Sequence, residues 1–447
     1  MKNTNKHLIM PIKPLVFALG VLAFTNTAFA AEQTLEQQLG QLLYEDINLS
    51  LHRNQSCESC HSLSTIEIPI EGVDGNFQMA EQPTLGFVDP SNVLNGTAVS
   101  DGSRRRAFGG LNAPSVGYAA FSPDFHWDGE LFIGGQFWNG RASNLVEQAK
   151  GPFVNPLEMA MPSEWAVIER LKQNRSYLRS FKRIYNIDLR RLREGNPKVG
   201  EAYEAVATAI SAFERTSRFN RFDSKFDFEA AGITQYNASE QRGADLFDDI
   251  AQCGDCHSTD EIDGESGPAL LTDFSYDNIG SPANPQIPRR PQADPGLQGN
   301  PNIAAVHGNA SELELDEVQG RHKVMSLRNI AMTAPYMHNG VFKSLREVVH
   351  FYNTRDVLPA CTAPADATNP GFAVTCWPQG EFHSTRNTKK MGNLGLTPQD
   401  EADIVEYMKT FTDNYPEWGN SNGLSDPNVP TGTPSPFANY PIPDHSN

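Results

Sequence analysis

The sequence predicts a mainly α-helical chain built from two similar halves, each with a long irregular insert. Three observations support this fold class. The motif Cys-x-x-Cys-His occurs twice, at residues 57–61 and 253–257. A helix pattern precedes each copy, and another closes each half. The inserts are rich in Gly, Pro and Asn, as in "GSPANPQIPRRPQADPGLQGNPN", and this composition favours ordered loops over sheet.

The repeated motif predicts covalently bound haem. Its two thiols can form thioether bonds to one haem, and the histidine that follows can bind the iron. A zinc or disulfide-redox role would account for one copy, but two complete copies in a chain with six cysteines favour haem. We therefore expect two cytochrome c-like haem domains, with c-type haems attached at Cys57, Cys60, His61, Cys253, Cys256 and His257.

Helices are expected before each motif and at the end of each half, in residues 34–49, 201–216, 238–252 and 397–411. In the first, four leucines have helical spacing: Leu35, Leu39, Leu42 and Leu43. Ser239 is the expected N-cap of the third helix. Thr397 is the expected N-cap of the fourth, because Pro398 suits the first helical position.

The beginning of the chain predicts export. Three lysines precede a short apolar run at residues 14–24, and Ala28-Phe29-Ala30 has the small-x-small pattern of a signal-peptidase site. No later run is long and apolar enough to predict a transmembrane helix. The expected parts are a signal peptide (1–30), an N-terminal haem domain (31–220), a C-terminal haem domain (221–420) and an extended tail (421–447).

The charge of the chain limits its partners. The formal net charge is −18, and it becomes −21 once the three lysines of the signal peptide are removed. Such an acidic protein is not expected to bind nucleic acid, and it suits a partner with a basic face. Cys361 and Cys376, which the haem motifs do not use, bracket a loop and are expected to form a disulfide; two free thiols are the alternative.

Three further stretches carry a family resemblance: "GGQFWNGRASNLVEQAKGPFVNPLEMA", "SLRNIAMTAPYMHNG" and "SLREVVHFYN". With the paired haem motifs they resemble the bacterial dihaem cytochrome c peroxidase family, including its MauG-like branch. The resemblance covers residues 40–415 approximately. It implies that the haem on His61 reacts with peroxide and that the haem on His257 transfers electrons.

The resemblance also implies the residues of the peroxide site. Glu158 matches the acid–base glutamate of the family, Gln148 the distal glutamine and Pro152 a proline of the pocket. Without the resemblance, Glu158 would be read as a solvated loop carboxylate. Gated peroxidases block the resting iron with a histidine, but His126 is the only histidine between His61 and Gln148 and no convincing match exists. We therefore expect an iron open to peroxide in the oxidised protein.

Trp138 matches the tryptophan that lies between the two haems in the family, whereas Trp127 is expected to be a core aromatic. The peroxidases place a methionine ligand seventeen residues after the proline of their "APY" motif. The same count from Pro335 reaches Tyr352, as in the MauG-like branch, so a phenolate is the expected sixth ligand of the second iron. The competing ligands are Met337, His338 and His350.

The resemblance further implies a calcium ion between the domains, held by the side chain of Asn112 and the carbonyls of Thr333 and Pro335. The expected function is an exported peroxidase that uses hydrogen peroxide to form high-valent haem iron and oxidises a protein partner. One alternative is a peroxidase that reduces peroxide with electrons from a small cytochrome c or cupredoxin. Another is a dihaem electron carrier. The expected location is the periplasm, either free or at the cell surface.

Overall fold

The computed structural model describes residues 33–71, 77–83, 86, 89, 98–262, 264, 267–287, 293–309, 311–362, 371–421 and 426–443. The predicted signal peptide, residues 1–30, lies outside the described residues. From Gln33 onward the chain forms one unit, and the boundary expected near residue 220 stays a prediction. Among the described residues, no helix has both the length and the apolar composition that crossing a membrane requires.

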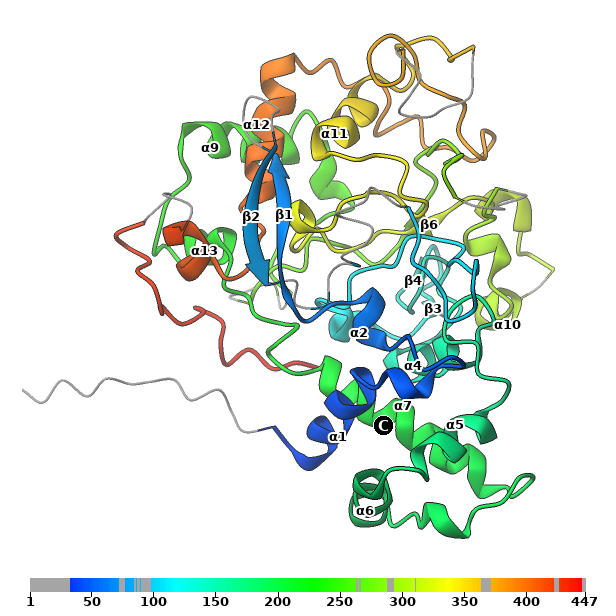
Figure 1. The fold of residues 1–447 in the computed structure, drawn as a ribbon. Coiled ribbons are helices and arrows are strands. Elements are labelled where there is room, and N and C mark those ends of the chain that lie inside the picture. Colours follow the sequence, from blue (N-terminus) through cyan, green and yellow to red (C-terminus); the bar gives the residue numbers. More distant parts are fainter. Residues whose placement is uncertain are drawn as a thin grey trace, which may run out of the picture. The chain divides into compact units, whose positions relative to one another are not determined.

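The described structure is helix-rich, with little strand, in agreement with a mainly α fold (Figure 1). Its α-helices are α1 (Leu35–Tyr44), α2 (Cys57–Cys60), α4 (Leu145–Val154), α5 (Glu164–Leu171), α6 (Arg175–Ile184), α7 (Lys198–Glu214), α8 (Lys225–Ala230), α9 (Ala238–Asp248), α10 (Ile303–His307), α11 (Leu345–Thr354), α12 (Pro398–Lys409) and α13 (Tyr415–Ser421). Its 3-10 helices are η1 (Ile47–Leu49), η2 (Ala119–Phe121), η3 (Leu189–Arg191), η4 (Cys253–Asp255), η5 (Leu297–Gly299), η6 (Leu315–Val318) and η7 (Ile330–Met332).

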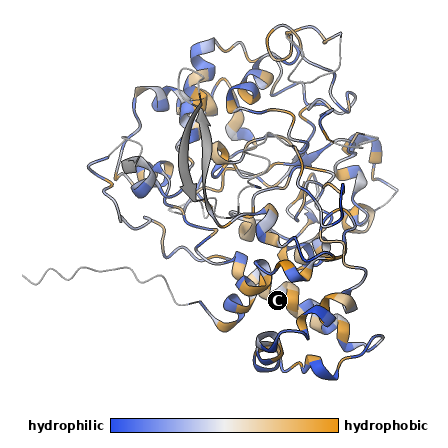
Figure 2. Cartoon of the chain, viewed as in Figure 1, coloured by the Kyte–Doolittle hydropathy of each residue, from blue (hydrophilic) through white to orange (hydrophobic). Residues whose placement is uncertain are grey.

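The same helix crossing occurs in each half. In the first, α1 packs against α7; in the second, α9 packs against α12. A glycine lies at each crossing, and a Cβ on Gly40 or Gly243 would collide with a backbone carbonyl of the opposite helix. Helices can approach this closely only where a residue without a side chain meets the partner. Figure 2 shows hydrophobic and hydrophilic residues along these helices, as expected for helices with one buried side.

Two large apolar clusters surround these crossings. The first includes Leu39, Leu43, Val206, Ile210 and Phe213, and the second includes Phe247, Ile404, Val405, Tyr407 and Phe411. All ten side chains are buried. Helices are therefore confirmed in all four predicted segments, each with one buried side. Two details differ: Leu35 and Leu42 are exposed, and Asn237 rather than Ser239 caps α9, because its side chain accepts from the Ser239 and Glu240 amides.

The sheets are small, and all three are antiparallel pairs. β1 (Thr65–Glu71) pairs with β2 (Phe77–Pro83), with Thr65 opposite Pro83. The other pairs are β3 (His126–Trp127) with β4 (Phe132–Ile133) and β5 (Tyr276–Asp277) with β6 (His322–Lys323). The hairpin of β1 and β2 corrects the expectation that the inserts contain no sheet. It lies against η7 of the second half, a contact that local composition cannot predict.

A buried polar network joins the two halves of the sequence. The Tyr118 hydroxyl donates to Asp413, 2.8 Å away, and accepts from the Phe222 amide. Asn329 Nδ2 donates to the same carboxylate at 2.7 Å. Nearby, Arg328 pairs with Asp227 at 2.6 Å, and both side chains are fully buried. Because nearly every polar group here has a partner, the network can hold the two halves in one arrangement.

The C-terminal tail is not solvated along its length. It begins where α13 ends, at Ser421, and Val429 is buried beside Phe228 and Tyr415. Phe437 and Tyr440 pack against a cluster that contains Phe121 and Phe222. The tail therefore covers apolar surface of the folded unit, which its polar composition did not indicate.

Candidate haem sites

The first Cys-x-x-Cys-His motif opens onto a large, mostly apolar cavity. Cys57 and Cys60 begin and end α2, and His61 follows as its C-cap residue. α4 contributes Gln148 and Pro152 to the same cavity, and Glu158 lies just after this helix. The three residues expected at the peroxide site therefore lie with His61 around one space.

Glu158 has few polar partners in this cavity. Asn155 Nδ2 donates to Glu158 Oε1 at 2.7 Å. Burial raises the pKa of the Glu158 carboxyl above its usual value, and the nearby Arg141 guanidinium and the Asn155 hydrogen bond oppose the shift. A carboxyl with a raised pKa can exchange a proton more readily near neutral pH than an exposed glutamate.

Two charged residues of this cavity were not predicted from the sequence. Arg141 lies over the Phe137 ring, with the guanidinium carbon 3.6 Å from the ring centroid. Glu214, at the end of α7, is buried, and its Oε2 makes no hydrogen bond to any described residue. Burial raises the pKa of Glu214 to about 8. In the sequence, Glu214 looks like a solvated residue at a helix end, so no local signal identifies it.

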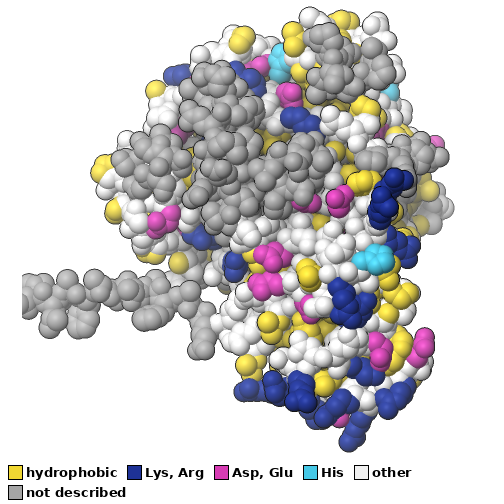
Figure 3. Space-filling view, in the orientation of Figure 1, with side chains coloured by type: hydrophobic (Ala, Val, Ile, Leu, Met, Phe, Trp, Pro, Cys, Tyr) yellow, Lys and Arg dark blue, Asp and Glu magenta, His cyan; other side chains and the backbone are white. Residues whose placement is uncertain are grey.

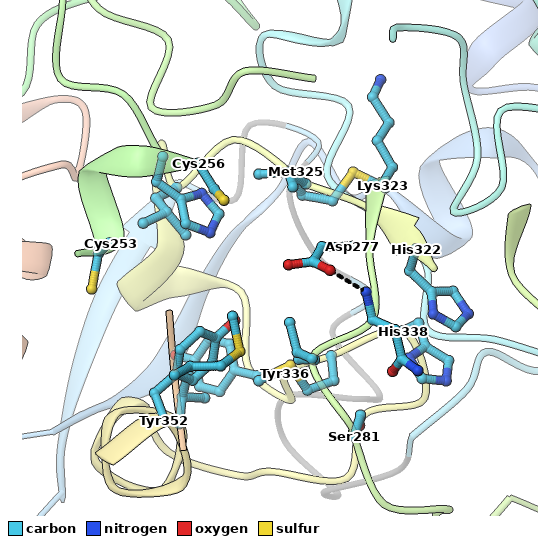
Figure 4. A pocket seen from close by; sticks show the side chains of 18 of the residues that line it. Cys253, Cys256, Asp277, Ser281, His322, Lys323, Met325, Tyr336, His338 and Tyr352 are labelled. Carbon is cyan, nitrogen blue, oxygen red and sulfur yellow. Dashed lines mark hydrogen bonds between the residues drawn. The ribbon is translucent and has the colours of Figure 1, made fainter. Parts of the chain in front are cut away.

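The second motif opens onto a second cavity of similar character (Figure 4). Cys253 begins η4, and Cys256 and His257 follow it. His257 Nδ1 lies 3.1 Å from the Leu271 carbonyl oxygen. Such a bond holds the proton on Nδ1 and leaves Nε2 free to bind a metal. Burial lowers the pKa of both His61 and His257, which favours the neutral ring that a metal ligand requires.

Tyr352, from α11, lies across this cavity from the haem motif. Figure 4 shows Cys256 and Met325 on one side and Tyr352 with Tyr336 on the other. Met337 and His338 also line the cavity, so three of the four candidate ligands are near. His350 is not among the described lining residues; its Nδ1 lies 2.9 Å from Glu401. Burial raises the pKa of Tyr352, so a phenolate there needs a strong positive charge such as ferric iron.

Other methionines of the second cavity were missed by sequence reasoning. Met325, Met391 and Met408 line it together with Met337. Methionine is common in ordinary cores, and these three lie far apart in sequence, so no pattern connects them.

Trp138 is the one described residue that lines both cavities. Its Nε1 donates to the Asn112 carbonyl at 2.9 Å. Its ring meets the rings of His322 and His338 edge to face, with centroids 6.4 and 6.3 Å apart. Those two imidazoles stack at 3.7 Å. Trp127 instead packs with Phe132 and His307 away from both cavities, as expected of a core aromatic.

The residues of both cavities fit covalently attached haem. Each cavity presents the two free thiols and the imidazole of its own motif, and most of its remaining lining is apolar; the second cavity also contains His322 and His338. A porphyrin needs such an apolar enclosure with one fixed axial nitrogen. No cluster of three or more His, Cys, Asp or Glu side chains suited to a metal occurs among the described residues.

The residues expected to hold calcium are partly brought together. Asn112 Nδ2 lies 2.7 Å from the Pro335 carbonyl oxygen. Thr333, two residues before Pro335, follows η7 as its C-cap residue. A calcium ion would need the amide oxygen of Asn112 in place of its nitrogen, so the site stays a prediction.

Two other predicted features lie outside the cavities. Cys361 and Cys376 form a disulfide with Cα atoms 4.9 Å apart. His126 is exposed and bonds to the Asp124 carbonyl, so it does not reach the first cavity in this structure.

Comparison with known proteins gives consistent matches. A family model described as di-haem cytochrome c peroxidase matches residues 34–235. The methylamine utilization protein MauG of Paracoccus denitrificans is 33% identical over 411 residues, which cover 90% of this chain and 94% of that protein. Cytochrome c peroxidase Ccp of Escherichia coli is 30% identical over 305 residues, covering 68% of this chain and 49% of that protein. The solved structure of the diheme peroxidase BthA from Burkholderia thailandensis is similar, with a TM-score of 0.66, 26% identity, and coverage of 85% and 86%.

Proposed function

Because this chain belongs to the dihaem cytochrome c peroxidase and MauG family, we propose that it is an exported peroxidase that uses hydrogen peroxide to oxidise a protein partner. The observation that carries the proposal is Tyr352. It lies in the second haem cavity, at the sequence position where the family's ordinary peroxidases carry a methionine. A phenolate ligand lowers the potential of iron and favours its oxidised states.

The residues of the first cavity suit peroxide activation. A haem bound there would supply the redox-active iron needed to cleave the oxygen–oxygen bond of hydrogen peroxide. Glu158 accepts the proton of the inner peroxide oxygen and returns it to the outer one, so that this oxygen leaves as water. The Gln148 amide can donate a hydrogen bond that orients the peroxide, and Pro152 contributes an apolar wall that limits entry of water.

Trp138 supports passage of electrons between the sites, because it lines both cavities and an indole can be oxidised by one electron. Its hydrogen bond to Asn112 fixes the ring in place. The protein partner then supplies electrons from the side of the second cavity. We further propose a calcium ion beside Asn112 and Pro335, and a periplasmic location that follows from the predicted signal peptide.

A second function is favoured by a specific observation. Met337 lines the same cavity as Tyr352, and a thioether ligand would make the protein an ordinary peroxidase that takes electrons from a small cytochrome c or cupredoxin. Relatives named cytochrome c peroxidase favour this alternative. A dihaem carrier has less support, because His61 is the one histidine among the described residues that line the first cavity, and Met159 is the one thioether there.

Electron paramagnetic resonance of the fully ferric protein distinguishes these functions. We expect one high-spin haem and one low-spin haem of histidine–tyrosinate type. In Tyr352→Phe the tyrosinate signal should disappear, whereas Met337→Leu should leave it unchanged. Two low-spin haems, one of histidine–methionine type, would contradict the MauG-like proposal and support a gated peroxidase or a carrier.

A further inference from the structure

Positive charge is concentrated in one short segment of an acidic chain. Residues 170–198 contain ten Lys and Arg and two acidic residues, a net charge of +8. Since the whole chain carries −18, all other residues together carry −26. Figure 3 shows Lys and Arg gathered at the lower end of the molecule, where Figure 1 shows α6. The segment is therefore a local exception to the charge of the protein.

The cations of α6 form one exposed stripe. Arg175, Arg179, Lys182 and Arg183 follow helical spacing and are all exposed. The opposite side of the helix buries Tyr177 and Phe181 in the first apolar cluster. No carboxylate of a described residue forms an ion pair with these four cations, which leaves their charge available to a partner.

The neighbouring turn extends this surface. Arg190, Arg191 and Arg193 are exposed on and just after η3, which contacts α6. Asp188 is shared by Arg190 and Arg191, so it compensates only one charge. We call these seven side chains the basic face: Arg175, Arg179, Lys182, Arg183, Arg190, Arg191 and Arg193.

Large apolar side chains are exposed on α1 and η1, beside the basic face. Leu35, Leu42 and Ile47 are 44%, 48% and 47% exposed. α1 is held against α6, because the Tyr177 hydroxyl bonds to the Leu42 carbonyl at 3.1 Å. Exposed leucine and isoleucine next to clustered arginine is the pattern of proteins that lie on a membrane surface.

We propose that the basic face, with Leu35, Leu42 and Ile47 at its edge, binds a lipid bilayer that contains anionic phospholipid. Guanidinium groups bind phosphate through paired hydrogen bonds, and clusters of four to eight cations bind anionic head groups. An acidic protein is the weaker candidate, because protein interfaces usually have aromatic anchors at their centre, and Tyr177 and Phe181 are buried. The proposal is independent of the peroxidase reaction.

Flotation of the intact haem-loaded protein with vesicles tests the proposal. We expect binding to phosphatidylcholine vesicles that contain phosphatidylglycerol, little binding to phosphatidylcholine alone, and release by salt. The variant R175E/R179E/R183E should bind more than about 100-fold more weakly, given the contribution of each basic residue near an anionic surface. R104E/R105E/R106E changes the net charge equally, outside the basic face, and should weaken binding by less than about tenfold.

Thermal melting of both variants checks that each is folded. Equal loss of binding in the two variants would mean that net charge alone drives adsorption and would overturn the proposal. Failure of the wild-type protein to bind anionic vesicles would also overturn the proposal. If that protein instead bound a small acidic cytochrome through Arg175, Arg179 and Arg183, the partner would be an acidic protein. Peroxidase activity can be present or absent in each case, so failure here is distinct from failure of the proposed function.

Discussion

Replacement of Glu158 by glutamine tests the chemistry of the first cavity. Glutamine has nearly the same shape, and its oxygen can still accept the hydrogen bond from Asn155, which lies 2.7 Å from Glu158 Oε1. The change removes only the ability to accept and return a proton. We therefore expect unchanged haem attachment and a slower reaction with peroxide.

The expected size of the effect follows from general acid–base catalysis. A positioned acid–base group contributes about 10²- to 10⁴-fold, or about 3–5 kcal/mol of activation free energy. Stopped-flow absorbance of the first haem measures the second-order rate constant with peroxide. Because burial raises the pKa of Glu158, the wild-type rate should fall as the pH is lowered through that raised value. The fall should be absent from Glu158→Gln.

Glu147→Gln is the matched control. Glu147 belongs to α4, the helix just before Glu158; it is 48% exposed and pairs with Lys150, and it is not among the described residues that line either cavity. Its replacement should leave the rate constant unchanged. A loss of less than about tenfold in Glu158→Gln, relative to this control, would refute the acid–base role.

Three further predictions follow from the structure. Trp138→Phe should leave peroxide binding at the first haem intact but slow the spectral response of the second haem, as measured by stopped-flow; an unchanged response would exclude Trp138 as the relay. Burial raises the pKa of Glu214 from 4.5 to about 8. The contribution of this carboxyl to the free energy of unfolding is therefore fully present below pH 4.5 and is lost as the pH rises through 8. Glu214→Gln should remove this loss, on the order of 3–5 kcal/mol, in thermal melts at pH 5 and pH 9, and parallel melts of both proteins would contradict it. Replacing Cys361 and Cys376 together by alanine should lower the free energy of unfolding by about 3 kcal/mol, since the disulfide closes a loop of 15 residues; an unchanged urea midpoint would contradict this.

Local patterns in the sequence predicted much of this protein. The haem motifs are contiguous, so Cys57, Cys60 and His61 can be found by inspection. The helices follow from apolar spacing, and Thr397 was correct as the N-cap of α12 because cap chemistry is local. The position of Trp138 beside both cavities agrees with what the family resemblance implied.

The features that escaped prediction depend on contacts distant in sequence. Glu214 acquires its raised pKa only because α7 carries it to the wall of the first cavity. Arg141 becomes a neighbour of Glu158 through the loop before α4. The β1–β2 hairpin lies against η7, some 260 residues later in the chain. Neither composition nor periodicity contains such information, whereas cap and motif chemistry is complete within a few residues.

The polar network of Tyr118, Asn329 and Asp413 links the half of the chain that carries the first haem motif to the half that carries the second. Electron tunnelling slows steeply as the gap between donor and acceptor widens, so a hinge between the halves would make the rate fluctuate with every opening. The buried hydrogen bond of 2.8 Å from Tyr118 to Asp413 crosses between the halves and resists such opening, and Asn329 holds the Asp413 carboxylate in place at 2.7 Å. With the two halves held in one arrangement, the rate of electron transfer between haems bound at the two motifs is set by the ligands of each haem and not by motion of the halves.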